Sequence, residues 1–122
     1  MSEFEEFWTE RHLCTLTTIR RDGSPHTVPV GVTFDPQSRT ARIITSGGSQ
    51  KVRNVEATGR ISVCQVDGRR WSTLEGTAVI AREPEAVRDA EERYARRYRV
   101  PRPNPERVVI VITVTRILGT CR

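Results

Sequence analysis

Residues 26–51 read HTVPVGVTFDPQSRTARIITSGGSQK, and the strands and turns of this stretch determine the fold class. The β-branched and apolar residues at 25–34 predict one strand, the Asp-Pro-Gln-Ser sequence predicts a turn, and 40–45 predict a second strand. Pro29 lies inside the first strand, where it cannot donate a backbone hydrogen bond to a neighbouring strand. Gly31 removes a side chain from the same segment. We therefore expect a sheet edge, a bulge or a ligand contact there.

The rest of the chain also consists of short apolar segments separated by turn residues. Asp-Gly pairs at 22–23 and 67–68 are typical of hairpins. Helices are predicted at 3–11, about 49–59 and 83–98, and further strands at 13–20, 61–66, 71–81 and 108–117. Because strands and helices do not alternate, we predict a mainly β (α+β) fold. It is a six-stranded antiparallel barrel with flanking helices, in a single domain of residues 1–122.

The charge distribution excludes several classes of partner. The net charge is +5, from 19 Arg and one Lys against 15 acidic residues. The arginines are scattered among glutamates, without a basic tail or a basic stripe with aromatic residues, which argues against nucleic-acid binding. No apolar run approaches the roughly 20 residues of a membrane span, and Glu3, Glu5 and Glu6 are unlike the start of a signal peptide. We expect a cytoplasmic protein without a membrane partner.

The cysteines and histidines do not form a metal or disulfide pattern. Cys14, Cys64 and Cys121 are widely spaced, and the chain has only two histidines. Cys14 and Cys64 lie in apolar strands and are expected to be small core residues. A chain of this size buries only about two-thirds of its unfolded surface. Association with a second copy is therefore expected to add stability.

The segment from Ser46 to Lys51, Ser-Gly-Gly-Ser-Gln-Lys, has the features of an anion site. Two glycines precede a helix that Ser49 can cap, so the amides of the first helical turn can face a ligand beside Lys51. Lys51 is the single lysine among 20 basic residues, and a site that retains lysine can require a compact ammonium group. A glycine turn before a helix also occurs without a ligand, and the spacing of a P-loop is absent. The residues alone therefore leave both interpretations open.

Three segments together resemble the pyridoxamine-phosphate-oxidase-like split β-barrel superfamily: HTVPVGVTFD at 26–35, IITSGGSQK at 43–51 and RWSTLEG at 70–76. The likeness includes RYRVPRPNP at 97–105 and covers nearly the whole chain. More narrowly, the chain resembles the B group of flavin/deazaflavin oxidoreductases, and within it the biliverdin reductases that use coenzyme F420. This resemblance implies a split β-barrel that forms a homodimer, with cofactor sites at the subunit interface.

The resemblance also implies which residues contact the cofactor. Thr45, Gln50 and Lys51 match the phosphate-binding positions, and residues 28–31 match the strand that lies along the cofactor ring. Flavin oxidases of this superfamily have an arginine where this chain has Gln50, which favours F420 over FMN. The residues expected around the cofactor are Val28, Pro29, Val30, Gly31, Ile44, Thr45, Ser49, Gln50, Lys51, Asn54 and, from the partner subunit, Trp71.

The activity that the resemblance implies is hydride transfer from reduced F420 to a small, conjugated, anionic substrate such as biliverdin or a similar tetrapyrrole. Arg69 and Arg70 follow a turn, so solvated surface charges are the default interpretation, and they are also candidates for binding substrate carboxylates or a polyglutamate tail. Trp71 also fits a core position. No nucleophile or acid–base pair stands out. An FMN-dependent enzyme of the same fold and a non-catalytic F420- or flavin-binding protein are therefore the alternatives, and the sequence assigns no partner to Arg97, Arg99 or Arg102.

Overall fold

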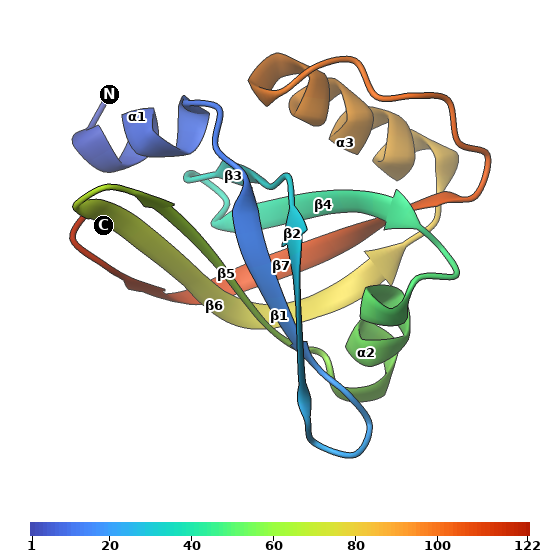
Figure 1. Ribbon diagram of the computed structural model, residues 1–122. Helices are drawn as coiled ribbons and strands as arrows, with labels where there is room; N and C mark the ends of the chain where they lie inside the picture. The colour runs from blue at the N-terminus through green and yellow to red at the C-terminus, as the bar shows by residue number, and fades with distance from the viewer.

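Seven antiparallel strands form one sheet in the computed structural model, which describes residues 1–122 (Figure 1). None of the three helices has the length and apolar character that a membrane span requires. In chain order the elements are α1 (Glu3–Thr9), β1 (Cys14–Ile19), β2 (Pro25–Val30), β3 (Thr33–Asp35), β4 (Thr40–Ser46), α2 (Gln50–Thr58), β5 (Arg60–Asp67), β6 (Arg70–Ala81), α3 (Pro84–Arg97) and β7 (Arg107–Leu118).

The strand order explains the open barrel. Across the sheet it is β2-β1-β5-β6-β7-β4-β3, so the two edge strands, β2 and β3, are consecutive in the chain. Only residues 31 and 32 separate them. The predicted antiparallel split barrel is confirmed, but the predicted number of six strands was wrong. The predicted strand at 25–34 is two strands, because the chain stops pairing with β1 at Gly31 and next pairs with β4. Val32 is buried, so the apolar pattern of the sequence continues through this break.

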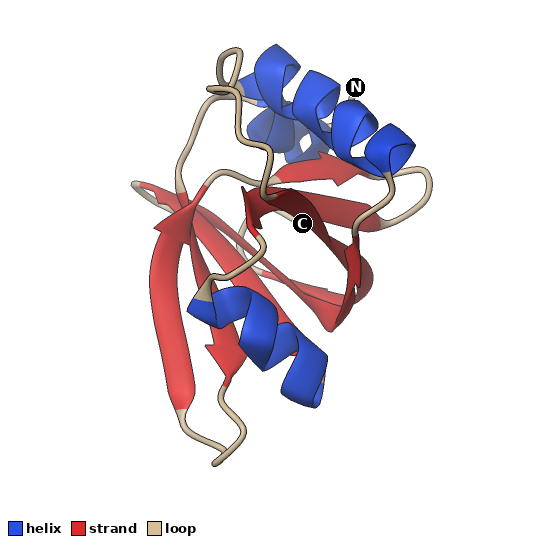
Figure 2. Ribbon diagram, turned by 90° about the vertical axis from the view of Figure 1, so that its right-hand side faces the viewer, coloured by secondary structure: helices blue, strands red, loops and turns tan.

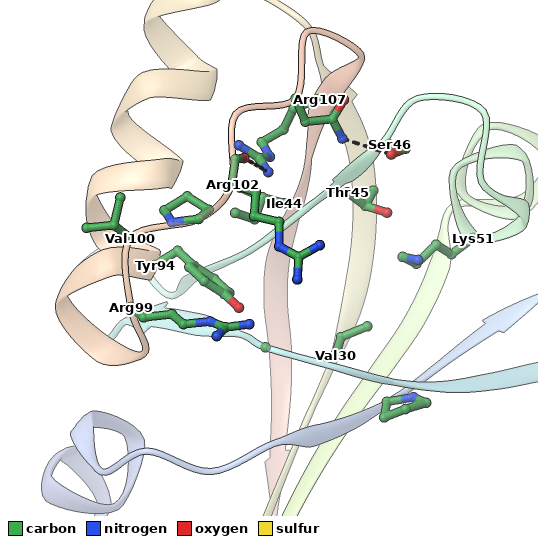
Figure 3. A pocket seen from close by; sticks show the side chains of 14 residues that line it. Val30, Ile44, Thr45, Ser46, Lys51, Tyr94, Arg99, Val100, Arg102 and Arg107 are labelled. Atoms are coloured by element: carbon green, nitrogen blue, oxygen red, sulfur yellow. Dashed lines mark hydrogen bonds between the residues drawn. The ribbon is translucent and has the colours of Figure 1, made fainter.

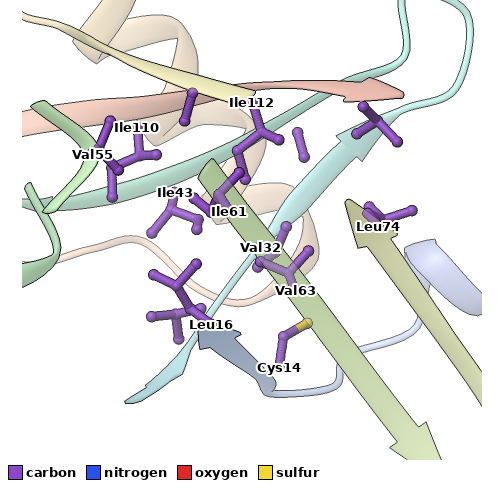
Figure 4. Packing of buried hydrophobic residues seen from close by; sticks show 14 of the residues in the cluster. Cys14, Leu16, Val32, Ile43, Val55, Ile61, Val63, Leu74, Ile110 and Ile112 are labelled. Atoms are coloured by element: carbon purple, nitrogen blue, oxygen red, sulfur yellow. The ribbon is translucent and has the colours of Figure 1, made fainter. Parts of the chain in front are cut away.

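The core lies inside the curled sheet and contains fifteen buried residues (Figure 4). Figure 2 shows α1 and α3 at one end of the curled sheet and α2 at the other. Phe7 and Trp8 of α1 are buried, and Trp8 Nε1 donates a hydrogen bond to Ser72 Oγ at 2.9 Å. Val52 and Val55 are the buried apolar residues of α2. The helices therefore close the ends of the barrel.

The three cysteines are free thiols. Cys14 is buried as predicted, and burial raises the pKa of its thiol to about 11. Cys64 is only half-buried, because its neighbours Val63 and Gln65 take two of the three inward positions on β5. The prediction of a core position for Cys64 was therefore wrong.

A β-bulge between Glu75 and Gly76 interrupts the pairing of β6 with β7. A Cβ atom on Gly76 would lie 1.9 Å from the carbonyl oxygen of Thr113. Only glycine fits at this close approach of two backbones. This gives a physical reason for the glycine that ends the RWSTLEG segment.

The buried side chain of Arg97, at the end of α3, joins three separate parts of the chain. Its guanidinium donates hydrogen bonds to the carbonyl oxygens of Glu10 at 2.8 Å and Val32 at 2.5 Å. It also donates to Gln65 Oε1 at 2.6 Å. Arg97 therefore connects the segment before β1, the break between β2 and β3, and the middle of β5.

Tyr98 reinforces the same break. Its hydroxyl donates to the carbonyl oxygen of His12 at 2.6 Å and accepts from the backbone amide of Val32 at 3.0 Å. Burial raises the pKa of Tyr98 to about 12, so this hydroxyl keeps its proton at neutral pH. The end of α3 thus satisfies the backbone groups that the interruption of the sheet leaves free.

Replacing Arg97 with methionine is expected to lower the free energy of unfolding by about 3 kcal/mol or more, because three acceptors lose their donor at roughly 1–3 kcal/mol each where they are buried. Arg96→Met is the matched control, since Arg96 is the exposed neighbour on the same helix, and it should change stability by less than about 0.5 kcal/mol. Urea unfolding followed by tryptophan fluorescence measures both values. Equal stability of the two variants would contradict the role assigned to Arg97.

Candidate anion-binding cleft

A cleft of about 470 Å³ opens where β2 ends, between β4, the first turn of α2 and the loop that joins α3 to β7 (Figure 3). Six of the residues expected around a cofactor line it: Pro29, Val30, Gly31, Ile44, Thr45 and Lys51. No acidic side chain does so. The cleft is therefore suited to an anionic ligand. The other lining residues are Ser46, Tyr94, Arg99, Val100, Pro101, Arg102, Asn104 and Arg107.

The end of the edge strand β2 forms one wall. Because β2 pairs only with β1, its other edge is free and tolerates Pro29 without loss of a strand-to-strand hydrogen bond. A Cβ atom on Gly31 would lie 2.8 Å from Cε2 of Tyr94 and 3.1 Å from Cε2 of Tyr98. Glycine at this position therefore allows both aromatic rings of α3 to pack against β2, which places Tyr94 at the cleft.

The first turn of α2 and Lys51 form the opposite wall. Ser49 is the N-cap residue, but its hydroxyl makes no capping hydrogen bond, contrary to our expectation, because it lies toward Thr45 Oγ1 at 3.4 Å. The amides of this turn have no side-chain acceptor, and the turn contains no acidic residue. Lys51 has no ion-pair partner, and burial lowers the pKa of its ammonium group. A phosphate-like anion would satisfy both the amides and the ammonium.

Five of the expected cofactor residues do not line the cleft: Ser49, Trp71 and three residues that lie behind its walls, Val28, Gln50 and Asn54. Gln50 Nε2 donates to Asn54 Oδ1 at 2.7 Å, and Asn54 Nδ2 donates to Thr18 Oγ1 at 3.0 Å. Asn54 is buried, so this pair fixes α2 against β1. Val28 packs against the hydrophobic core. These side chains support the walls of the cleft from behind.

Arg69, Arg70 and Trp71 lie outside the cleft of their own chain. The Arg70 guanidinium contacts Glu10 at 2.8 Å and Asp67 at 2.5 Å, and hydrogen bonding to Arg70 is the main reason why the pKa of Glu10 falls to about 2. Trp71 is 37% exposed on the outer face of the sheet. Within one chain, Arg70 therefore already has two carboxylate partners.

The loop between α3 and β7, together with the first residue of β7, contributes cleft residues that the sequence did not assign. They are Arg99, Arg102 and Arg107, together with Asn104. Arg107 is paired with Glu91 at 2.7 Å. The sequence indicated these residues through the close spacing of arginines and prolines at 97–105. This segment follows neither the helical nor the strand pattern, so periodicity does not indicate where its side chains lie.

The split barrel has a cationic cleft at the N-terminus of a helix, an arrangement suited to an anionic ligand. Comparison with known sequences identifies the family. The pyridoxamine 5'-phosphate oxidase family model matches residues 1–121, and the chain belongs to this family. The resemblance found in the sequence is thus confirmed.

Individual relatives agree with this assignment. The chain is 57% identical, over 114 residues, to the F420H2-dependent biliverdin reductase of Mycobacterium tuberculosis (strain CDC 1551 / Oshkosh), covering 93% of this chain and 83% of that protein. A crystal structure of a conserved hypothetical protein from Mycobacterium tuberculosis has a TM-score of 0.81 at 28% identity, over 96% of this chain and 82% of that one. An F420 reductase structure has a TM-score of 0.78 at 22% identity, over 97% and 98% of the chains, and supports the fold.

Lys51→Met is expected to stabilise the ligand-free protein at pH 7, because a half-buried, unpaired ammonium destabilises the folded state. The pKa of Lys51 is lower in the folded than in the unfolded protein, so the unfolded state binds more protons between the two values. The stability of the wild type therefore rises with pH through that interval, up to the ordinary value of 10.5. Thermal melting should show a smaller difference in melting temperature between Lys51→Met and the wild type at pH 10 than at pH 7. A difference that is independent of pH would contradict this interpretation.

Proposed function

We propose that this protein is an F420H2-dependent reductase and that its substrate is biliverdin or a similar tetrapyrrole. The observation that carries the proposal is the unpaired, half-buried Lys51 beside the uncapped first turn of α2, at one end of a cleft without acidic residues. The 57% identical relative with this activity supports the same assignment.

The residues of the cleft fit a phosphate-bearing tricyclic cofactor. Lys51, Thr45 and the first-turn amides of α2 would hold the phosphate, and residues 29–31 would support the ring. Both F420 and FMN carry such a ring and phosphate. Gln50 is neutral, and its side chain is hydrogen-bonded to Asn54 and, at 2.6 Å, to Arg53. Position 50 therefore provides no second positive charge for a phosphate. Lys51 is thus the single cation of the first turn of α2 that lines the cleft, which favours F420.

The protein contributes orientation and electrostatics to the proposed reaction. When bound and reduced, F420 supplies a hydride from carbon 5 of its ring. The wall at 29–31 would fix one face of that ring, which leaves the other face for substrate. The arginines of the cleft raise the local concentration of an anionic substrate, and the absence of carboxylates avoids repulsion.

A homodimer is part of the proposal. Val66 and Trp71 are cross-strand neighbours on β5 and β6, and they expose 63% and 37% of their surface. Leu13, which precedes β1, is 70% exposed. Monomeric proteins rarely expose apolar side chains as a contiguous patch. We infer that a second copy covers this outer face and that each Trp71 reaches the cleft of the partner subunit.

Sedimentation equilibrium is expected to give twice the chain mass of 13.9 kDa. Val66→Glu should shift the mass toward that of the monomer, because it introduces a charge into the proposed interface. Ala57→Glu is the control, since it adds the same charge at an exposed position of α2. A wild-type monomer, or a Val66→Glu dimer as stable as the wild type, would argue against this interface.

Equilibrium titration with oxidised F420 and with FMN, side by side, tests the cofactor assignment. We expect micromolar or tighter binding of F420 and weaker binding of FMN. Lys51→Met should raise the Kd for F420 about tenfold or more, on the scale of roughly 1.5–3 kcal/mol for a hydrogen bond to a charged group.

Steady-state reduction of biliverdin by F420H2, followed by absorbance, then tests turnover. Tight FMN binding without F420 binding would place the protein with flavin-dependent relatives. F420 binding without biliverdin turnover would refute the tetrapyrrole assignment and leave the cofactor assignment standing.

A further inference from the structure

The loop between α3 and β7 has a fixed backbone on both sides of residues 99–102. At its start, Tyr98 is bonded to the break between β2 and β3. At its end, the carbonyl oxygen of Arg102 accepts a hydrogen bond from Arg107 Nη2 at 2.7 Å. Asn104 Nδ2 donates to Ser46 Oγ at 2.9 Å. Three prolines further restrict this segment. The backbone positions from which the loop side chains extend are therefore fixed.

Arg99 and Arg102 extend from this loop into the cleft, on the side opposite Lys51 (Figure 3). Both side chains are exposed, and neither makes a hydrogen bond or an ion pair within the chain. Arg107 differs, because its charge is compensated by Glu91. The cleft therefore has two sets of uncompensated cations, one on each side.

The two sets differ in chemistry. Lys51 is a compact point charge beside helix amides, which suits a phosphate. A guanidinium presents a planar fork of donors, which matches the two oxygens of a carboxylate. Two such forks on one short, fixed loop suit a ligand with more than one carboxylate, or two ligands that meet in the cleft.

We propose that Arg99 and Arg102 form a carboxylate-binding pair that determines the specificity of the cleft for multiply charged anionic ligands. This inference rests on the proposed function and extends it. Two sources of carboxylate fit: the propionates of a tetrapyrrole substrate, or the glutamate tail of F420. The phosphate site at Lys51 and the carboxylate site at Arg99 and Arg102 are then independent parts of the cleft.

The test is equilibrium binding to the wild type, Arg99→Gln, Arg102→Gln and the double variant, with Arg96→Gln as the control. Arg96 is an exposed arginine of α3 that does not line this cleft. One pair of probes is biliverdin and its dimethyl ester, followed by absorbance. The other pair is F420 with glutamates and F420 without them, followed by fluorescence. Because Arg99 and Arg102 have no partners in the chain, all variants should melt at the wild-type temperature.

The double variant is expected to raise the Kd of a carboxylate-bearing probe at least tenfold, while the Kd of its neutral or tail-free counterpart stays within twofold. A loss confined to biliverdin identifies substrate carboxylates as the ligand, and a loss confined to glutamylated F420 identifies the cofactor tail. If the wild type binds biliverdin and F420, and the double variant binds them with the same Kd as Arg96→Gln, the carboxylate-binding role of Arg99 and Arg102 is refuted. The proposed function then stands. If the wild type binds neither F420 nor biliverdin, the proposed function fails, and this inference fails with it.

Discussion

The open barrel depends on one buried cation, the guanidinium of Arg97. The sheet is interrupted at Gly31 and Val32, and an interruption inside a core leaves backbone groups without strand partners. Arg97 supplies donors to three acceptors from distant parts of the chain, and its guanidinium lies over the rings of two aromatic side chains, Trp8 and Tyr98. Arginine stays protonated even where burial disfavours charge. An aliphatic side chain would fill the same space but leave the acceptors unpaired.

The cleft is a consequence of this arrangement. Because β2 leaves the sheet at Gly31, its edge is free on one side, and the same helix that carries Arg97 brings Tyr94 against it. The loop that follows α3 starts at Tyr98, so the interactions that hold the barrel edge also position Arg99 and Arg102. The stability of the fold and the shape of the cleft therefore depend on one helix. A change at the buried end of α3 is expected to alter both.

The sequence predicted most strands because alternation and turn residues are local signals. It did not separate β2 from β3, because Val32 is buried and continues the apolar pattern across the break. It predicted an anion site at residues 46–51, and the structure places Lys51 in a cleft without acidic residues, since two glycines and the single lysine are distinctive even without a structure. It placed Gln50 and Asn54 around the cofactor, whereas in the structure these two polar side chains bond to each other and do not line the cleft. It did not assign Arg99 and Arg102, because nothing local distinguishes two arginines among nineteen.

The basic residues differ in whether they have hydrogen-bond or ion-pair partners within the chain. Arg70 and Arg107 have carboxylates within the chain, and Arg97 has carbonyl and amide oxygens. Lys51, Arg99 and Arg102 have none, and all three line one cleft. Burial of the unpaired ammonium group of Lys51 lowers stability, so the presence of this lysine in the cleft requires another benefit. Anion binding as proposed would supply it, with a phosphate at Lys51 on one wall and carboxylates at Arg99 and Arg102 on the other.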